Sequence, residues 1–165
     1  MAILAYGVNY RTAPVEFREK IAFPEEALGD ALHAATRAIP SVSEAAIIST
    51  CNRTELYLAM DPNQEHGVVE WLADARAIQP AELEAVAYSH WDQDAARHLI
   101  RVASGLDSQV LGEPQIMGQV KTAYDLARTA GTVGPELSLL SQITLSAAKR
   151  VRTDTDIGRN PVSVA

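Results

Sequence analysis

The chain has 165 residues, 47% of them hydrophobic, and its 14 Lys and Arg against 21 Asp and Glu give a formal net charge of −7 at pH 7. This length suits one domain or two small lobes, and the acidic balance argues against a generic nucleic-acid binder. The single cysteine excludes an internal disulfide, and no apolar run approaches the roughly 20 residues of a membrane helix. We therefore expect a cytoplasmic protein without a membrane anchor.

The first part of the chain alternates between strand and helix patterns. In chain order, strands are expected at residues 2–9, 44–49, 55–60 and 85–90, and helices at 24–39, 64–78 and briefly from Pro80. Apolar Leu56 and Leu58 alternate with Glu55, Tyr57 and Ala59, and this alternation predicts that the third strand is half-buried. The order of strand, helix, strand, strand, helix, strand predicts an α+β fold, a ferredoxin-like split βαβ sandwich over residues 1–91.

After Trp91 the strand signals stop, and three helices are expected at residues 92–104, 114–130 and 136–155. Asp92 has the residue type of an N-cap, and Gly105 and Gly131 follow the first two helices as C-terminal stops. These patterns predict a helical subdomain over residues 92–165.

Basic side chains gather near the end of the last predicted helix, at Lys149, Arg150 and Arg152. They would either contact phosphate or stabilise the negative end of the helix dipole, and we favour the second role.

Cys51 lies where the apolar run of residues 45–48 turns polar, in the segment Ser49-Thr50-Cys51-Asn52-Arg53-Thr54-Glu55. A thiol kept for packing would lie within the apolar run, so this position indicates a nucleophile, with an inert buried thiol as the alternative. Arg53 could favour the thiolate by its charge or hold a substrate carboxylate in bidentate fashion.

His98 interrupts the apolar face of the predicted helix at residues 92–104. It could carry a proton for Cys51 or stabilise its thiolate, and the alternative is a partly exposed helical histidine without a catalytic role. The four histidines and the single cysteine show no metal-ligand spacing, so we expect no metal.

The segment of residues 105–119 contains three glycines together with Ser, Glu and Gln side chains. Glycines let a backbone approach a ligand closely, and such side chains could bind an amine, a carbonyl and a carboxylate; an ordinary connection between helices is the alternative. Neither a G-x-G-x-x-G motif nor a Walker A lysine motif occurs, so no nucleotide cradle is recognisable.

Five blocks of sequence are informative together: Gly7–Pro14, Ser49–Tyr57, His98–Ser108, Leu111–Ile116 and Ala148–Arg152. In this order they resemble the N-terminal catalytic domain of glutamyl-tRNA reductases. The resemblance implies that Cys51 attacks the ester of glutamyl-tRNA and holds glutamate as a thioester. Hydride from NADPH would then release glutamate-1-semialdehyde for tetrapyrrole biosynthesis.

The resemblance also implies which side chains complete the substrate pocket. The implied substrate contacts are Thr50, Asn52, Arg53, Ser108, Glu113, Pro114, Gln115 and Gln119, and His98 matches a histidine important for activity. Within this set, Arg53 suits the side-chain carboxylate of glutamate, and Glu113 could receive its α-ammonium.

The family continues into an NADPH-binding domain and a long helical dimerisation domain, whereas this chain stops at Ala165, about where the cofactor domain would begin. The resemblance therefore implies NADPH bound by a domain absent from this chain, a homodimer in the full-length enzyme, and glutamate-1-semialdehyde aminotransferase as a candidate partner. Two other interpretations stay open. One is a non-redox thiol acyltransferase or hydrolase, and the other is an amino-acid-binding regulatory module in which Cys51 is structural.

Overall fold

The structure of the protein is a computed structural model, which describes residues 1–158. Its centre is a four-stranded sheet made of β1 (Ala2–Asn9), β2 (Glu44–Ser49), β3 (Arg53–Met60) and β4 (Tyr88–Trp91). The strand order is β2-β3-β1-β4, and every neighbouring pair is antiparallel. β3 therefore lies between β1 and β2, which are joined by a helical crossover, and this arrangement confirms the predicted split βαβ sandwich.

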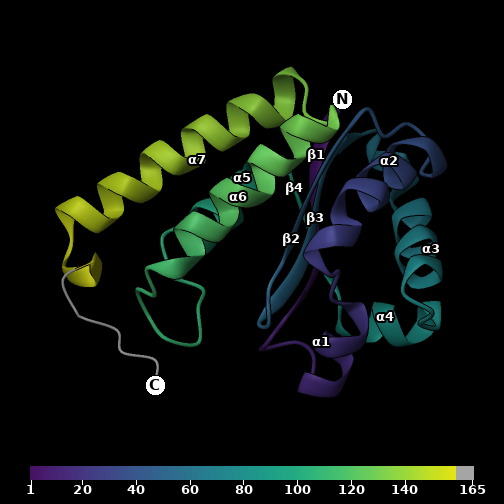
Figure 1. The fold of residues 1–165 in the computed structure, drawn as a ribbon, viewed down its shortest axis with the longest axis horizontal. Coiled ribbons are helices and arrows are strands. Elements are labelled where there is room, and N and C mark those ends of the chain that lie inside the picture. Colours follow the sequence, from purple (N-terminus) through teal and green to yellow (C-terminus); the bar gives the residue numbers. More distant parts are fainter. Residues whose placement is uncertain (159–165) are drawn as a thin grey trace.

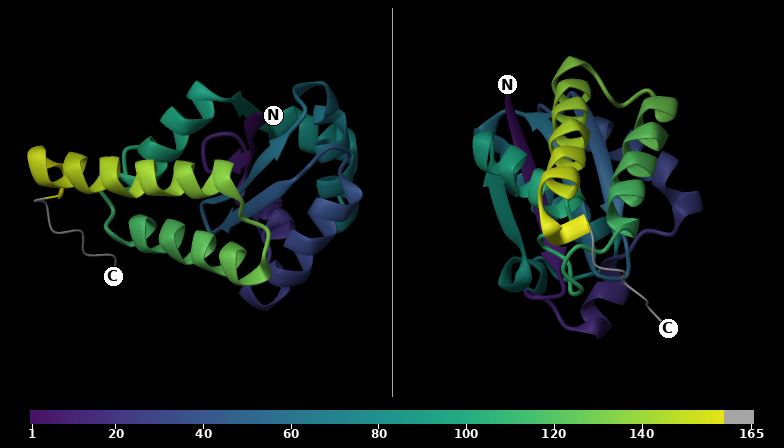
Figure 2. Two further views of the ribbon diagram at one scale, coloured as in Figure 1. Left: turned by 90° about the horizontal axis from the view of Figure 1, so that it is seen from above. Right: turned by 90° about the vertical axis from the view of Figure 1, so that its left-hand side faces the viewer.

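The helices form two layers with the sheet between them (Figure 1). One layer contains α1 (Val15–Ile21), α2 (Leu28–Ala38), α3 (Glu65–Ala75) and α4 (Pro80–Val86). The other contains α5 (Gln93–Ala103), α6 (Gln115–Ala130) and α7 (Pro135–Asp154), and α7 extends past the end of the sheet (Figure 2). Short 3-10 turns lie at Glu25–Ala27, Pro62–Gln64 and Asp156–Gly158.

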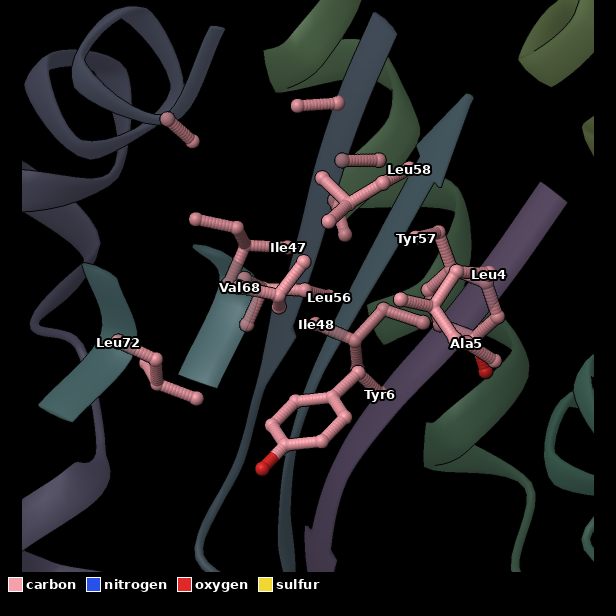
Figure 3. Close-up of a cluster of buried hydrophobic side chains, with 14 of the residues drawn as sticks. Leu4, Ala5, Tyr6, Ile47, Ile48, Leu56, Tyr57, Leu58, Val68 and Leu72 are labelled. Atoms are coloured by element: carbon pink, nitrogen blue, oxygen red, sulfur yellow. The ribbon is translucent and has the colours of Figure 1, made fainter. Parts of the chain in front are cut away.

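The core fills the spaces on both faces of the sheet. On one face, Ile47 and Leu56 lie toward the helix that carries Val68 and Leu72 (Figure 3). On the other face, the ring centroids of Tyr57 and Tyr124 lie 6.4 Å apart. Burial of these side chains is the main force that holds the layers together.

The expectation that β3 is half-buried was wrong, since all of its residues are buried. Leu56 and Leu58 face one helical layer, and Glu55 and Tyr57 face the other. The reason is that α6 and α7 return across the second face of the sheet, against β2 and β3, a packing that local alternation cannot show.

Three local expectations also differ from the structure. Helix α1 was not expected, because it has only seven residues and buries only Ile21. The last strand begins at Tyr88 rather than residue 85, because α4 continues to Val86. Asp92 does not cap α5 with its side chain; instead its carboxylate accepts from the Ile3 N–H at 2.9 Å and its N–H donates to the Ile3 carbonyl.

No helix among the described residues is long and apolar enough to cross a membrane. The boundary between the two subdomains at residue 91 stays a prediction. The end of the second one, residues 159–165, lies outside the part of the chain that the structure describes.

Candidate active site around Cys51

Cys51 is exposed in the short turn that joins β2 to β3. The turn is closed by the Thr50 N–H, which donates to the Arg53 carbonyl at 2.8 Å, and by the Asn52 N–H, which donates to Thr50 Oγ1 at 3.2 Å. From α1, the Arg18 Nε–H donates to the Cys51 carbonyl at 3.3 Å. The thiol is thus presented to solvent by a turn whose backbone is fixed on both sides. Sequence reasoning missed Arg18 because it missed α1.

A small cavity adjoins the thiol and gathers most of the predicted substrate contacts. This cavity, the Cys51 pocket, has a volume of about 30 Å³ and is lined by Thr50, Cys51, Asn52, Arg53, Ser108, Glu113, Ile116 and Gln119. The first four come from the β2–β3 turn and the start of β3, and the others from the loop before α6 and from α6 itself. Two segments far apart in sequence therefore meet around the one cysteine.

Three of the predicted site residues lie outside the Cys51 pocket. Pro114 is the exposed N-cap of α6, and Gln115, the next residue, lines a neighbouring groove. His98 lines a different cavity, of about 350 Å³, together with Tyr88 and His90. The structure does not bring its imidazole to the wall of the Cys51 pocket.

The Arg53 guanidinium is buried, with only 2% of the residue exposed, and it contacts two carboxylates. Nη1 donates to Glu55 at 3.2 Å, while Nη2 donates to the carboxylate of Asp107 at 3.0 Å and to its main-chain carbonyl. Burial alone would lower the pKa of Arg53, but the charges of Glu55 and Asp107 raise it above its usual value. To clamp a substrate carboxylate, Arg53 would have to exchange one of these partners.

Glu55 is the centre of this polar network. It is fully buried, and besides Arg53 it accepts from the Tyr57 hydroxyl at 2.9 Å and from the Tyr88 hydroxyl, while His98 Nε2 lies 2.5 Å from Oε2. Burial would raise the pKa of Glu55, but the hydrogen bond and charge of His98 and the charge of Arg53 lower it to about 2. The carboxylate therefore stays ionised at neutral pH.

Among the described residues, this network connects His98 to the Cys51 pocket. Its ring stacks on His90 with centroids 4.6 Å apart, and burial together with the charge of His98 lowers the pKa of His90. The connection runs from His98 to Glu55 and from Glu55 to Arg53, which lines the pocket. His98 therefore contacts Glu55 rather than the wall of the Cys51 pocket, and its expected catalytic role stays a prediction.

The loop between α5 and α6 is closed at its base by two glycines. The Gly112 N–H donates to the Gly105 carbonyl at 3.0 Å, and both residues have positive φ, +79° and +80°. A Cβ on Gly112 would lie 2.4 Å from the Ile157 carbonyl oxygen. Both positions therefore require glycine.

Arg152 also holds this loop. Its Nη1 donates to the carbonyls of Gly112, at 3.2 Å, and of Ser104, at 3.5 Å. Arg152 lies in the last turn of α7, where its charge suits the helix dipole as expected, and these contacts to another segment are a role that the sequence did not indicate; phosphate contact stays a prediction. The contacts fix the base of the loop that supplies Ser108 and Glu113 to the Cys51 pocket.

Comparison with known proteins agrees with this arrangement. A family model described as "Glutamyl-tRNAGlu reductase, N-terminal domain" matches residues 6–155. The chain belongs to this glutamyl-tRNA reductase family. The resemblance seen in the sequence is thereby confirmed.

The relatives are named as glutamyl-tRNA reductases. The chain is 59% identical over 165 residues to that of Ectopseudomonas mendocina and 58% identical to that of Pseudomonas aeruginosa. It covers 38% and 39% of those two proteins, respectively. The solved glutamyl-tRNA reductase from Methanopyrus kandleri matches with a TM-score of 0.82 and 29% identity, over 98% of this chain and 37% of that one. The fold is therefore that of the corresponding part of a glutamyl-tRNA reductase.

The described part of this family member does not fit a dinucleotide. Dinucleotide cradles use a glycine-rich turn between a parallel strand and a helix. Here the sheet is antiparallel, and residues 10–14, which connect β1 to α1, contain no glycine. Among the same residues, no group of three or more His, Cys, Asp and Glu side chains is placed to hold a metal ion.

Proposed function

We propose that this chain supplies the nucleophile and the glutamate pocket of a glutamyl-tRNA reductase, with Cys51 forming a glutamyl thioester. The observation that carries the proposal is the exposed Cys51 thiol beside a pocket built from two distant segments. A cysteine with a purely structural role would be expected inside the core, surrounded by apolar side chains rather than beside a polar pocket. Membership of the family supplies the substrate class.

The first step is an acyl transfer. The Cys51 thiolate attacks the ester carbonyl of glutamyl-tRNA, a carbon–sulfur bond forms, the carbon–oxygen bond to the terminal ribose breaks, and the ribose oxygen takes a proton. Thr50, Asn52 and Ser108 are hydrogen-bonding groups on the wall of the pocket for the ester and amine of the substrate. The side chain of each can donate a hydrogen bond to the oxyanion that develops during the attack.

The glutamyl group itself requires charged partners at both ends. Glu113 lines the pocket and is the acceptor for the α-ammonium, and Arg53 is the donor for the side-chain carboxylate after exchange of a contact with Glu55 or Asp107. His98 acts on this site through Glu55. Gln119 completes the wall of the pocket, whereas Pro114 and Gln115 lie next to it at the start of α6.

Reduction belongs to another part of the protein in this proposal. The chain spans less than two fifths of its named relatives, and its described residues do not fit a dinucleotide. We assign NADPH binding, reduction to glutamate-1-semialdehyde and homodimer formation to the remaining length found in those relatives. Contact with the aminotransferase that consumes the semialdehyde is part of the same proposal.

The decisive experiment traps the intermediate. The 165-residue chain is incubated with tRNA carrying labelled glutamate, quenched in acid and digested, and the peptide containing Cys51 is analysed by mass spectrometry. A glutamyl adduct on Cys51, absent from Cys51→Ser, supports the proposal. An unmodified, slowly alkylated thiol would instead support a binding module in which Cys51 is structural.

A parallel assay separates redox from non-redox chemistry. Free glutamate, glutamate-1-semialdehyde and NADPH oxidation are measured separately after the chain has been mixed with substrate and NADPH. We expect glutamate that depends on Cys51 and no oxidation of NADPH, because the described residues do not fit a dinucleotide and water can reach the exposed thioester. Stoichiometric oxidation of NADPH would contradict our assignment of the cofactor site to another part of the protein.

A further inference from the structure

A second, larger hollow lies next to the Cys51 pocket, between the end of β2 and α6. This hollow, the α6 groove, has a volume of about 560 Å³ and shares Thr50 and Gln119 with the Cys51 pocket. A ligand that occupied both would pass Thr50 and Gln119 and reach the pocket that Cys51 lines.

The lining of the α6 groove suits an uncharged ring system. Leu28, Ile48 and Leu126 supply apolar walls, whereas Gln115 and Thr122 supply hydrogen-bonding edges. Glu25 is the one charged side chain in the lining, and none of the lining residues is basic. Such a surface favours a flat ring with polar edges over a phosphate, which would need cationic partners.

We infer that the α6 groove binds the 3′-terminal adenosine of the acyl donor, while the Cys51 pocket binds its glutamyl group. This inference rests on the proposed function. The ester carbonyl attacked by Cys51 carries two substituents, and the polar lining of the Cys51 pocket suits the charged acyl group, which enters as Arg53 exchanges a partner and the pocket widens. The leaving alcohol then lies in a larger neighbouring hollow, from which it departs as the carbon–oxygen bond breaks and the ribose oxygen is protonated.

A competing hollow lies near Arg18 and is lined by Cys51 itself. It has a volume of about 490 Å³ and is lined by Arg18, Glu19 and Ala22 among others. The Arg18 guanidinium already donates to the carbonyls of Ala13, at 2.7 Å, and Cys51. This second hollow has fewer apolar walls for a purine, so we assign the nucleoside to the α6 groove.

The test blocks each hollow separately. Gly118 lines the α6 groove, and a Cβ added there meets no heavy atom within 4 Å, so Gly118→Leu introduces a side chain into the groove without a clash at its base. Leucine also favours a helix more than glycine, which protects the fold of α6. Ala22→Leu is the matched control, because it places the same side chain in the hollow near Arg18.

Two substrates then distinguish binding in the α6 groove from binding in the Cys51 pocket. One is 3′-O-glutamyl-adenosine, and the other is the α-ethyl thioester of glutamate, which has no nucleoside. Gly118→Leu is expected to raise KM about tenfold or more for glutamyl-adenosine and to change it less than about twofold for the ethyl thioester. Equal changes for both substrates, no change for either, or a selective loss in Ala22→Leu would overturn the inference.

A binding measurement distinguishes failure of this inference from failure of the proposed function. Adenosine alone is added to Cys51→Ser, which cannot form the thioester, and its contact with the protein is followed by saturation-transfer NMR. We expect contact that Gly118→Leu abolishes in the same background. Thioester formation on Cys51 without any adenosine contact would overturn the inference alone, whereas adenosine contact without acylation of the wild-type chain by either ester would overturn the proposed function.

Discussion

Glu55→Gln should destabilise the fold in a way that depends on pH. The substitution keeps the size of the side chain and much of its hydrogen bonding but removes the charge that Arg53 and His98 face. At about 1.4 kcal/mol for each pH unit, the difference between the ordinary pKa of 4.5 and about 2 in the fold corresponds to about 3 kcal/mol. We therefore expect the free energy of unfolding to fall by about 3 kcal/mol at pH 7.

The sign of the pH dependence follows from the lowered pKa of Glu55. Its stabilising contribution is fully present above the unfolded value of 4.5 and is lost as the pH falls toward about 2. The difference between wild type and Glu55→Gln should therefore shrink as the pH falls from about 5 to about 2. Urea unfolding at several pH values, followed by tryptophan fluorescence, measures this difference.

Glu82→Gln is the control for this experiment, because Glu82 is exposed on α4 and should show no such loss. A loss below about 1 kcal/mol at pH 7 in Glu55→Gln, or a loss that is the same at pH 7 and pH 3, would refute the assignment of an ionised Glu55 to the centre of the network.

Three further substitutions test the pocket and its supports. Cys51→Ser should abolish the glutamyl adduct and leave the melting temperature almost unchanged, since the residue is exposed; a melted variant would mean that the thiol is structural. Arg53→Lys keeps the charge but loses the planar fork, so it should weaken glutamyl-tRNA binding by about 1 to 3 kcal/mol and reduce the preference for glutamyl over glutaminyl substrate; an unchanged preference would rule out the carboxylate clamp. Arg152→Met should speed amide hydrogen exchange in residues 105–113, whereas Arg150→Met, at an exposed position of the same helix, should not; equal exchange in both would show that Arg152 does not hold the loop.

Much of the fold could be predicted because its patterns are local. The strand at Ala2–Asn9 and the helix at Gln115–Ala130 were expected within a residue of their observed bounds, since alternation and helical periodicity each persist over several residues. Helix α1 lacks such a repeat. The burial of β3 on both faces depends on where α6 and α7 pack, and this is a property of the tertiary structure rather than of the strand.

Some residues of the candidate site could be predicted from the local sequence, and others could not. Cys51 and Arg53 are close in sequence, so a local change from apolar to polar residues was enough to indicate them. Ser108 and Glu113 came from the resemblance, and their place beside Cys51 depends on the closed loop before α6. Sequence reasoning missed the role of Glu55, because an acid in an alternating strand normally faces solvent, whereas here the helical layer that carries His98 covers it.

The network bears on both of the roles that the sequence left open for Arg53. A guanidinium that stabilised the thiolate would need uncompensated positive charge directed at the sulfur atom. Arg53 instead contacts Glu55 and Asp107, so its charge is already balanced by two carboxylates. Its contact with Asp107 also joins the start of β3 to the loop that carries Ser108, so a substrate carboxylate that displaced Asp107 from Arg53 would loosen that loop at the moment of binding. Recognition of a substrate carboxylate by Arg53 would likewise require one of these two partners to be exchanged, so it stays a prediction that the substrate preference of Arg53→Lys tests.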